Sequence, residues 1–103
     1  MKPVFIRFTD EKGETTKTFS TVSLKTGLMD NIFDIAERAE ALQKNQLQMS
    51  EVRSFFKELK AVIVAAFGGQ FTYDELNANV EQQELMLVFQ QLCANITGQM
   101  QKN

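Results

Sequence analysis

The chain has 103 residues, enough for one domain that buries roughly two-thirds of the surface its unfolded chain would expose. Its 44% hydrophobic residues and nine phenylalanines are typical of a folded globular protein and exclude a disordered one. Lys and Arg number 11 against 13 Asp and Glu, which gives a net charge of −2, and the basic residues are scattered along the chain. Both features argue against a dedicated nucleic-acid binder.

The first predicted element is a β-hairpin over about residues 3–22. Val4, Ile6 and Phe8 alternate with less apolar residues, which is the period-two signal of a strand. Gly13 lies in a polar connection, and the Thr-rich run that follows it favours a second extended segment. Two strands alone are marginal in water, so we expect the hairpin to pack on a helix or to pair with another strand.

Helical spacing of apolar residues predicts the next two elements. A first helix is expected over about residues 27–43, with Thr26 as its N-cap. A second is expected over about 51–67, with Ser50 as its N-cap. Gly68 and Gly69 end this helix, because glycine readily adopts the left-handed conformation of a helix terminus. Its predicted buried face consists of Val52, Phe55, Phe56, Leu59, Ile63, Ala66 and Phe67.

The clearest local signal is a capping box at the start of a third helix. Thr72 and Glu75 have the spacing at which each side chain satisfies the other residue's free backbone N–H. Phe71 and Leu76 flank this box in the positions of a hydrophobic staple, so both are expected to be buried. The helix is predicted over about residues 73–78, because Asn79 tolerates a left-handed terminus.

A last helix is predicted over about residues 82–97, ended by Gly98 and followed by a fraying tail. Its buried face is expected to hold Leu85, Val88, Phe89, Leu92 and Ile96. No repeat or linker divides the chain. The fold class is therefore predicted as α+β, a single domain over residues 1–103 with an N-terminal β-hairpin followed by a bundle of about four helices.

The residues offer no chemistry for catalysis. The chain has no His, and its single cysteine, Cys93, lies in an apolar helical run without an activating base. The acidic turn around Gly13 lacks the ligand spacing of a calcium loop, and Gly68-Gly69 lacks the Lys of a phosphate loop. We therefore expect no enzyme activity, no catalytic, cofactor or metal site, and no cofactor. The chain also lacks the roughly 20 apolar residues of a membrane span, so a soluble, cytoplasmic protein is expected.

Two apolar runs exceed what one core face requires. Residues 61–67 and 85–89 are apolar around the whole helix circumference, which indicates burial on more than one side. Either these are central helices of a monomeric bundle, or they form an interface. We favour an interface, and flexible side chains such as Met49 suit an adaptable surface. The candidate partner-binding residues are Phe56, Val64, Met86 and Leu87.

The segment from Phe67 to Leu76, followed by Glu84-Leu85 and an amphipathic helix, resembles tail assembly chaperones of long-tailed phages that infect Gram-positive bacteria. The similarity is sharpest over about residues 62–97. The resemblance implies a protein that binds the tape-measure protein and keeps it soluble during tail assembly. It further implies action in the host cytoplasm and absence from the finished virion.

The partners expected on this basis are the tape-measure protein, further copies of the chain in a homo-oligomer, and the major tail protein, with no nucleic acid and no membrane. A small phage or bacterial regulator that binds proteins, and a structural subunit of the tail, stay open as alternatives. Chaperones of this kind commonly have a longer form made by ribosomal frameshifting. The ending Gln101-Lys102-Asn103 can be encoded by a slippery sequence, and it can equally be an ordinary polar tail.

Overall fold

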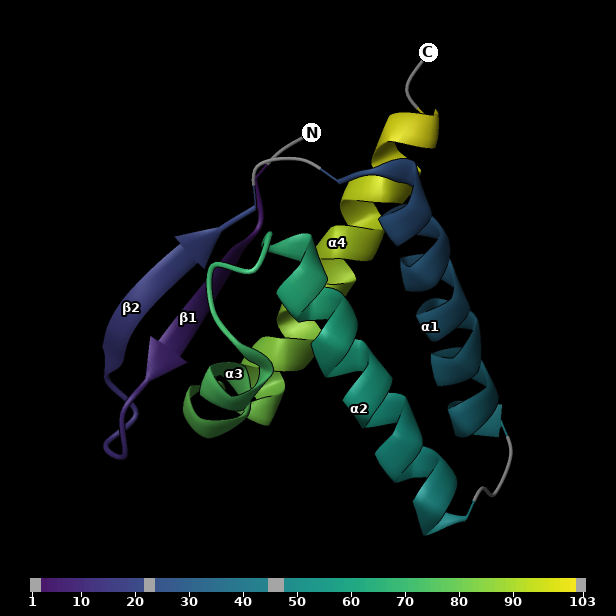
Figure 1. Ribbon diagram of the computed structural model, residues 1–103. Helices are drawn as coiled ribbons and strands as arrows, with labels where there is room; N and C mark the ends of the chain where they lie inside the picture. Colours follow the sequence, from purple (N-terminus) through teal and green to yellow (C-terminus); the bar gives the residue numbers. More distant parts are fainter. Residues whose placement is uncertain (1–2, 22–23, 45–47, 102–103) are drawn as a thin grey trace.

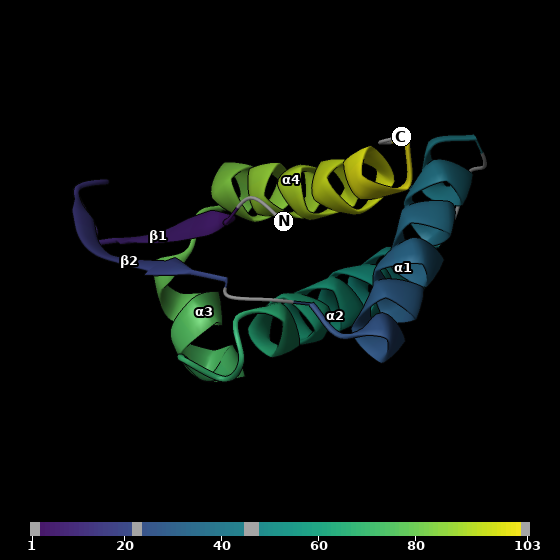
Figure 2. The ribbon, with the colours of Figure 1, turned by 90° about the horizontal axis from the view of Figure 1, so that it is seen from above.

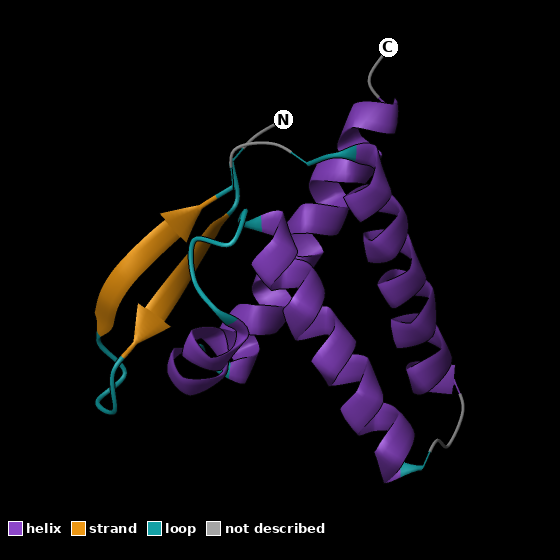
Figure 3. Ribbon diagram, viewed as in Figure 1, coloured by secondary structure: helices purple, strands orange, loops and turns teal. Residues whose placement is uncertain are grey.

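The computed structural model describes residues 3–21, 24–44 and 48–101, and it confirms the predicted α+β architecture. A two-stranded antiparallel hairpin precedes four helices (Figures 1 and 3). The elements are β1 (Phe5–Thr9), β2 (Thr15–Ser20), α1 (Thr26–Lys44), α2 (Met49–Ala66), α3 (Tyr73–Asn79) and α4 (Gln82–Gln101). No helix in these described ranges has the length and apolar character needed to cross a bilayer.

The molecule is a slab, with principal dimensions of 39 × 37 × 19 Å. Its thin dimension corresponds to about two helix diameters of 10 Å. Figure 2 shows the hairpin at one end and α1 at the other, with α2 and α4 between them. Helix α4 packs on α1, on α2 and on β1, so it joins the helical part to the hairpin.

The hairpin follows the predicted alternation. Val4, Ile6 and Phe8 are buried, whereas Phe5 on the other face is 53% exposed. Ile6 pairs with Phe19, and the register shifts after Phe8. The connection is tightened by Asp10, whose carboxylate accepts the backbone N–H groups of Lys12 and Glu14, and by Gly13 at φ 83°.

The two outer edges of this small sheet differ. On β1 the backbone N–H of Arg7 points away from β2 and donates to Glu84 Oε2 of α4 at 2.9 Å. The Thr9 hydroxyl on the same strand donates to the carbonyl of Asn79 at 3.4 Å. Among the described helices and strands, β2 packs only on β1; outside them, its Phe19 ring meets Phe71, and the amide of Gln70 donates to the Ser20 carbonyl. The edge of β1 is therefore covered, and that of β2 is largely open.

An aromatic cluster joins the hairpin to the helices. Phe71 lies with its ring centroid 5.1 Å from Phe8, 5.1 Å from Phe19 and 5.5 Å from Phe67. Edge-to-face and tilted pairs at these separations stabilise beyond the area they bury. The cluster therefore connects both strands to the end of α2 and the start of α3.

The main core lies between the helices and β1. The predicted inward residues of α2 and α4 are largely confirmed, and the buried ones are Phe55, Leu59, Ile63, Ala66 and Phe67 from α2 and its end, and Leu85, Val88, Phe89, Leu92 and Ile96 from α4. Val52 and Phe56 are only half-buried. Helical spacing thus identified the side of each helix that faces the core.

The capping box at the start of α3 is confirmed. The backbone N–H of Glu75 donates to the Thr72 hydroxyl at 3.1 Å, and the backbone N–H of Thr72 donates to the Glu75 carboxylate at 3.0 Å. Phe71 and Leu76, the expected staple residues, are 3% and 1% exposed. The chain thereby enters α3 with its free N–H groups satisfied and its flanking apolar residues in the core.

We expect Thr72→Ala to lower the free energy of unfolding by about 0.5–2 kcal/mol, because Glu75 loses the acceptor for its N–H group. Urea denaturation measures this change. Thr26→Ala is the matched control, since Thr26 is exposed and makes no side-chain hydrogen bond among the described residues. Equal stabilities of the two variants would contradict the capping role.

Gly68 and Gly69 end α2 as predicted, with φ values of 66° and 73°. The Gly68 N–H donates to the Ala65 carbonyl, and the Gly69 N–H donates to that of Val64, so both satisfy the helix end. A Cβ at either glycine would meet no atom within 4 Å. The requirement for glycine here is therefore conformational and not steric.

We expect Gly68→Ala and Gly69→Ala each to cost about 1–2 kcal/mol, the strain of a left-handed residue with a Cβ. Gly27→Ala should have the opposite sign and stabilise by about 0.5–1 kcal/mol, because Gly27 lies inside α1 with open space at its Cβ and no positive φ. Thermal melts of the three variants check both signs. A destabilised Gly27→Ala would show that α1 needs flexibility at that point.

Two predicted N-caps are wrong. Helix α1 begins at Thr26, so Thr26 is its first residue, and the Leu28 and Met29 N–H groups donate to the Lys25 carbonyl. Helix α2 begins at Met49, which makes Ser50 its second residue, and Gln48 occupies the cap position without a side-chain hydrogen bond. The pattern around Ser50 favoured a cap at that residue, whereas the helix already begins one residue earlier, at Met49.

Two predicted C-termini are also wrong. Asn79 is the last residue of α3 and has no positive φ; its side chain instead donates to the Glu75 carbonyl at 2.9 Å, and Val80 leaves the helix in an extended conformation. Gly98 does not end α4, which continues to Gln101 through part of the tail expected to fray. A glycine inside a helix costs only about 1 kcal/mol, so it does not by itself stop one. Lys102 and Asn103 lie outside the described residues.

Candidate partner-binding surface

The four residues predicted to bind a partner do not form one surface. Phe56 and Val64 belong to α2, and Met86 and Leu87 to α4. Val64 and Met86 are half-buried and pack against the core, whereas Leu87 is 43% exposed. Phe56 lines a groove along α2, and Leu87 lines a different hollow beside the hairpin. Only Phe56 therefore lies in an apolar groove.

This groove runs between α2, α3 and the start of α4 and has a volume of ≈ 680 Å³. Its apolar lining comes from all three elements and the Val80 connection: Met49, Val52, Phe56, Leu76, Val80 and Leu85. Met49 stands at one end and is 75% exposed. Phe56 is held by an edge-to-face contact with the buried Phe55, at a centroid distance of 5.2 Å. The groove therefore has a fixed aromatic centre and a flexible thioether at its end.

One side of the groove is basic. Arg53, Lys57 and Lys60 line it, and their spacing places them along one side of α2. The Lys60 ammonium donates to Asn77 Oδ1 at 2.7 Å and lies 5.9 Å from the centre of the Tyr73 ring. Within the described part of the chain, none of the three cations forms an ion pair with a carboxylate. No carboxylate among the described side chains therefore neutralises their charge.

The sequence alone identified only part of this groove. Phe56 was predicted, and Met49 was noted as an adaptable side chain. Val80, Tyr73 and Lys60 were missed, because they meet only once α3 folds back against α2. A signal was nevertheless present, since Arg53, Lys57 and Lys60 recur at i, i+4 and i+7 in the sequence.

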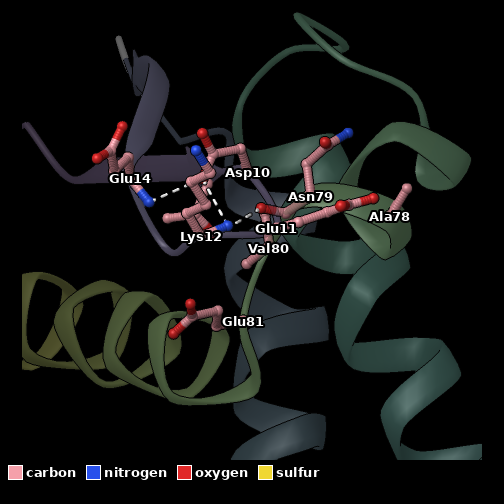
Figure 4. A pocket seen from close by; sticks show the side chains of 9 residues that line it. Asp10, Glu11, Lys12, Glu14, Ala78, Asn79, Val80 and Glu81 are labelled. Atoms are coloured by element: carbon pink, nitrogen blue, oxygen red, sulfur yellow. Dashed lines mark hydrogen bonds between the residues drawn. The ribbon is translucent and has the colours of Figure 1, made fainter.

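A second hollow, of ≈ 700 Å³, lies between the hairpin turn and residues 78–81. Figure 4 shows the lining side chains, which include Asp10, Glu11, Glu14 and Glu81. The Asp10 carboxylate already accepts two backbone N–H groups of the turn. Across the described residues, no group of three or more His, Cys, Asp or Glu side chains is arranged to hold a metal ion. The acidic residues thus have a structural explanation as a solvated turn.

Cys93 is half-buried in α4, and burial raises the pKa of its thiol. The thiolate is the nucleophilic form, so a raised pKa makes this cysteine less reactive at neutral pH. We expect alkylation of Cys93 by iodoacetamide at pH 8 to be slower in the folded protein than in urea, as followed by mass spectrometry. Equal rates would show that burial neither shields the Cys93 thiol nor raises its pKa.

Comparison with known families bears on the alternatives left open by the sequence. A family model described as "phage tail chaperone protein" matches residues 3–103, which is nearly the whole chain. This chain belongs to the phage tail chaperone family. No curated protein and no solved structure matches it significantly.

Membership of the phage tail chaperone family covers the hairpin as well as the helices, because the match begins at residue 3. It also includes the segment from Phe67 to Leu76, on which the resemblance was based. In this phage tail chaperone the capping box, the glycine pair and the staple are structural, since they position α3 against α2. In that position α3 forms one wall of the groove, through Tyr73, Leu76 and Asn77.

Proposed function

We propose that this chain is a tail assembly chaperone that binds the tape-measure protein and keeps it soluble during tail morphogenesis. Family membership supports a chaperone of phage tails. The observation that carries the finer proposal is the apolar groove along α2, with Phe56 at its centre and Met49 exposed at its end. A long helical protein with apolar segments presents the kind of surface that such a groove accepts. The proposed role is binding, without catalysis.

Co-expression tests this proposal. The tape-measure protein of the same phage is produced with and without the chain, and its soluble fraction is compared. We expect it to aggregate alone and to remain soluble, and to co-purify, when the chain is present. If the chain leaves the soluble fraction unchanged and does not co-purify, the proposed function is wrong. Repeating the experiment with the major tail protein tests that further partner.

The proposal includes the homo-oligomer expected from the sequence. Ala61 and Ala65 of α2 and Leu87 of α4 are exposed, and self-association through α2 and α4 would bury them. Sedimentation at high micromolar concentration should then give a mass above 11.7 kDa. Leu87→Glu, at a position already 43% exposed, should weaken association or tape-measure binding without unfolding. Val64→Glu is a harsher test because Val64 is half-buried.

The same role places the protein in the host cytoplasm during assembly and not in the mature virion. Mass spectrometry of purified virions distinguishes this role from that of a structural tail subunit, which would be retained there.

A longer, frameshifted form requires a slippery sequence at the codons for Gln101 to Asn103 and an overlapping −1 frame. The gene sequence tests both requirements.

A further inference from the structure

We propose that the groove between α2 and α3 binds an amphipathic helix that carries acidic residues along one flank of its apolar stripe. This inference rests on the proposed function in one respect, since it takes that helix to belong to the tape-measure protein. It adds the chemistry by which the helix is recognised, namely apolar anchors beside Asp or Glu.

The apolar part of the groove has the dimensions of a helix-binding site. Its α2 side extends from Met49 to Lys60, roughly 16 Å at a rise of 1.5 Å per residue. This length matches about three turns of a partner helix, which would insert side chains at i, i+3 or i+4, and i+7. Phe56 lies midway along this length. Residues from α3 and α4 form the opposite wall, so a helix would be held from two sides.

Charge selects the kind of helix. Every charged side chain that lines the groove is basic: Arg53, Lys57 and Lys60. The acidic residues of α2 in this region, Glu51 and Glu58, do not line it, and Glu58 pairs with Arg38 of α1. The protein as a whole carries a charge of −2, so this basic side is a local departure from the overall balance. A partner with carboxylates on the facing flank would neutralise it.

A second copy of the chain does not supply such a helix from its described side chains. Its exposed large hydrophobic residues are Phe5, Met49 and Leu87. Phe5 lies in a strand, Met49 belongs to the groove itself, and Leu87 is the one exposed large hydrophobic residue among the α4 side chains described, those of residues 82–96. None of them forms a helical stripe of anchors. We therefore assign the groove to a helix of another protein.

Two synthetic peptides of about 15 residues, long enough to span the groove, test the assignment directly. Both carry identical leucines at i, i+3, i+4 and i+7; one has Glu and the other Lys on the flanking positions. Fluorescence anisotropy at low salt should show the Glu peptide binding roughly tenfold more tightly, with the difference shrinking as salt is raised. Equal binding of the two peptides, or preference for the Lys peptide, would overturn the proposal.

Variants localise the effect. In Arg53→Glu/Lys57→Glu, both positions are exposed, and the preference should reverse toward the Lys peptide. Lys17→Glu/Lys25→Glu is the matched control, because it reverses the same number of exposed charges away from the groove. Met49→Ser should weaken the binding of both peptides without changing the melting temperature of the protein. If the control double variant reverses the preference as fully, overall charge and not this groove is responsible.

The peptide test and the tape-measure test together distinguish failure of the groove assignment from failure of the proposed function. If the parent chain keeps the tape-measure protein soluble and Arg53→Glu/Lys57→Glu does so equally well, the groove assignment is wrong while the proposed function stands. If the parent fails to keep it soluble yet binds the Glu peptide selectively, the groove assignment stands without that partner. If Met49→Ser converts an oligomeric parent into a monomer in sedimentation, the groove is occupied by a second copy, and the proposal is refuted.

Discussion

Phe71→Ala is expected to lower the free energy of unfolding by about 3–5 kcal/mol, the usual cost of truncating a buried phenylalanine. Phe71 is 3% exposed and contacts the rings of Phe8, Phe19 and Phe67. The substitution removes the ring at the point where both strands, α2 and α3 meet. Because a domain of this size has a total stability of about 5–15 kcal/mol, the loss is a large part of the whole.

Urea denaturation measures this loss, and Phe5→Ala is its control. Phe5 lies on the same hairpin but is 53% exposed, so its truncation should change stability by about 0.5 kcal/mol or less. Phe71→Leu provides a second variant that keeps apolar volume if the alanine variant does not fold. Similar effects of Phe71→Ala and Phe5→Ala would show that the aromatic cluster does not hold the hairpin.

Glu84→Ala is expected to destabilise by about 1–3 kcal/mol, the cost of leaving a hydrogen-bonding group without its partner. The Glu84 side chain is 10% exposed; it accepts the Arg7 backbone N–H and the Arg7 guanidinium, with Nη2 at 3.0 Å. The side-chain hydrogen bond to Glu84 and the negative charge of Glu84 also raise the pKa of Arg7, so its guanidinium is cationic at neutral pH. Removing the carboxylate leaves the covered edge of β1 without an acceptor.

Two measurements separate this effect from a general loss of packing. The Arg7 amide should exchange its hydrogen faster in Glu84→Ala than in the parent, and Glu84→Gln, which retains a carbonyl acceptor, should restore most of the protection. Gln83→Ala is the control at the neighbouring exposed position of α4. Unchanged exchange at Arg7 in Glu84→Ala would mean that the bond is not formed in solution.

The sequence predicted those features that depend on neighbouring residues. The capping box at Thr72 and Glu75 was predicted correctly because both partners lie within one turn, where spacing fixes geometry. The inward faces of α2 and α4 were predicted for the same reason, since the helical period is local. The glycine pair after α2 likewise has a conformational requirement of its own.

Features decided by distant contacts could not be predicted. Glu84 appeared only as part of the resemblance, because its partner Arg7 lies 77 positions away in the sequence. The ends of α3 and α4 were misplaced at Asn79 and Gly98, since neither residue by itself determines whether the backbone continues. The groove was missed as a unit for the same reason. Its lining comes from three helices whose relative positions depend on the aromatic cluster and the core.

The unequal edges of the hairpin bear on aggregation. Growth of a cross-β stack requires each molecule to offer two free edges, one for each neighbour. Here the β1 edge is occupied by Glu84 and Asn79, and only β2 is open, with the charged Lys17 in its middle. Pairing through β2 would consume the one open edge of both molecules and stop at a closed pair. The unequal edges thereby limit edge-to-edge association of folded molecules to two chains.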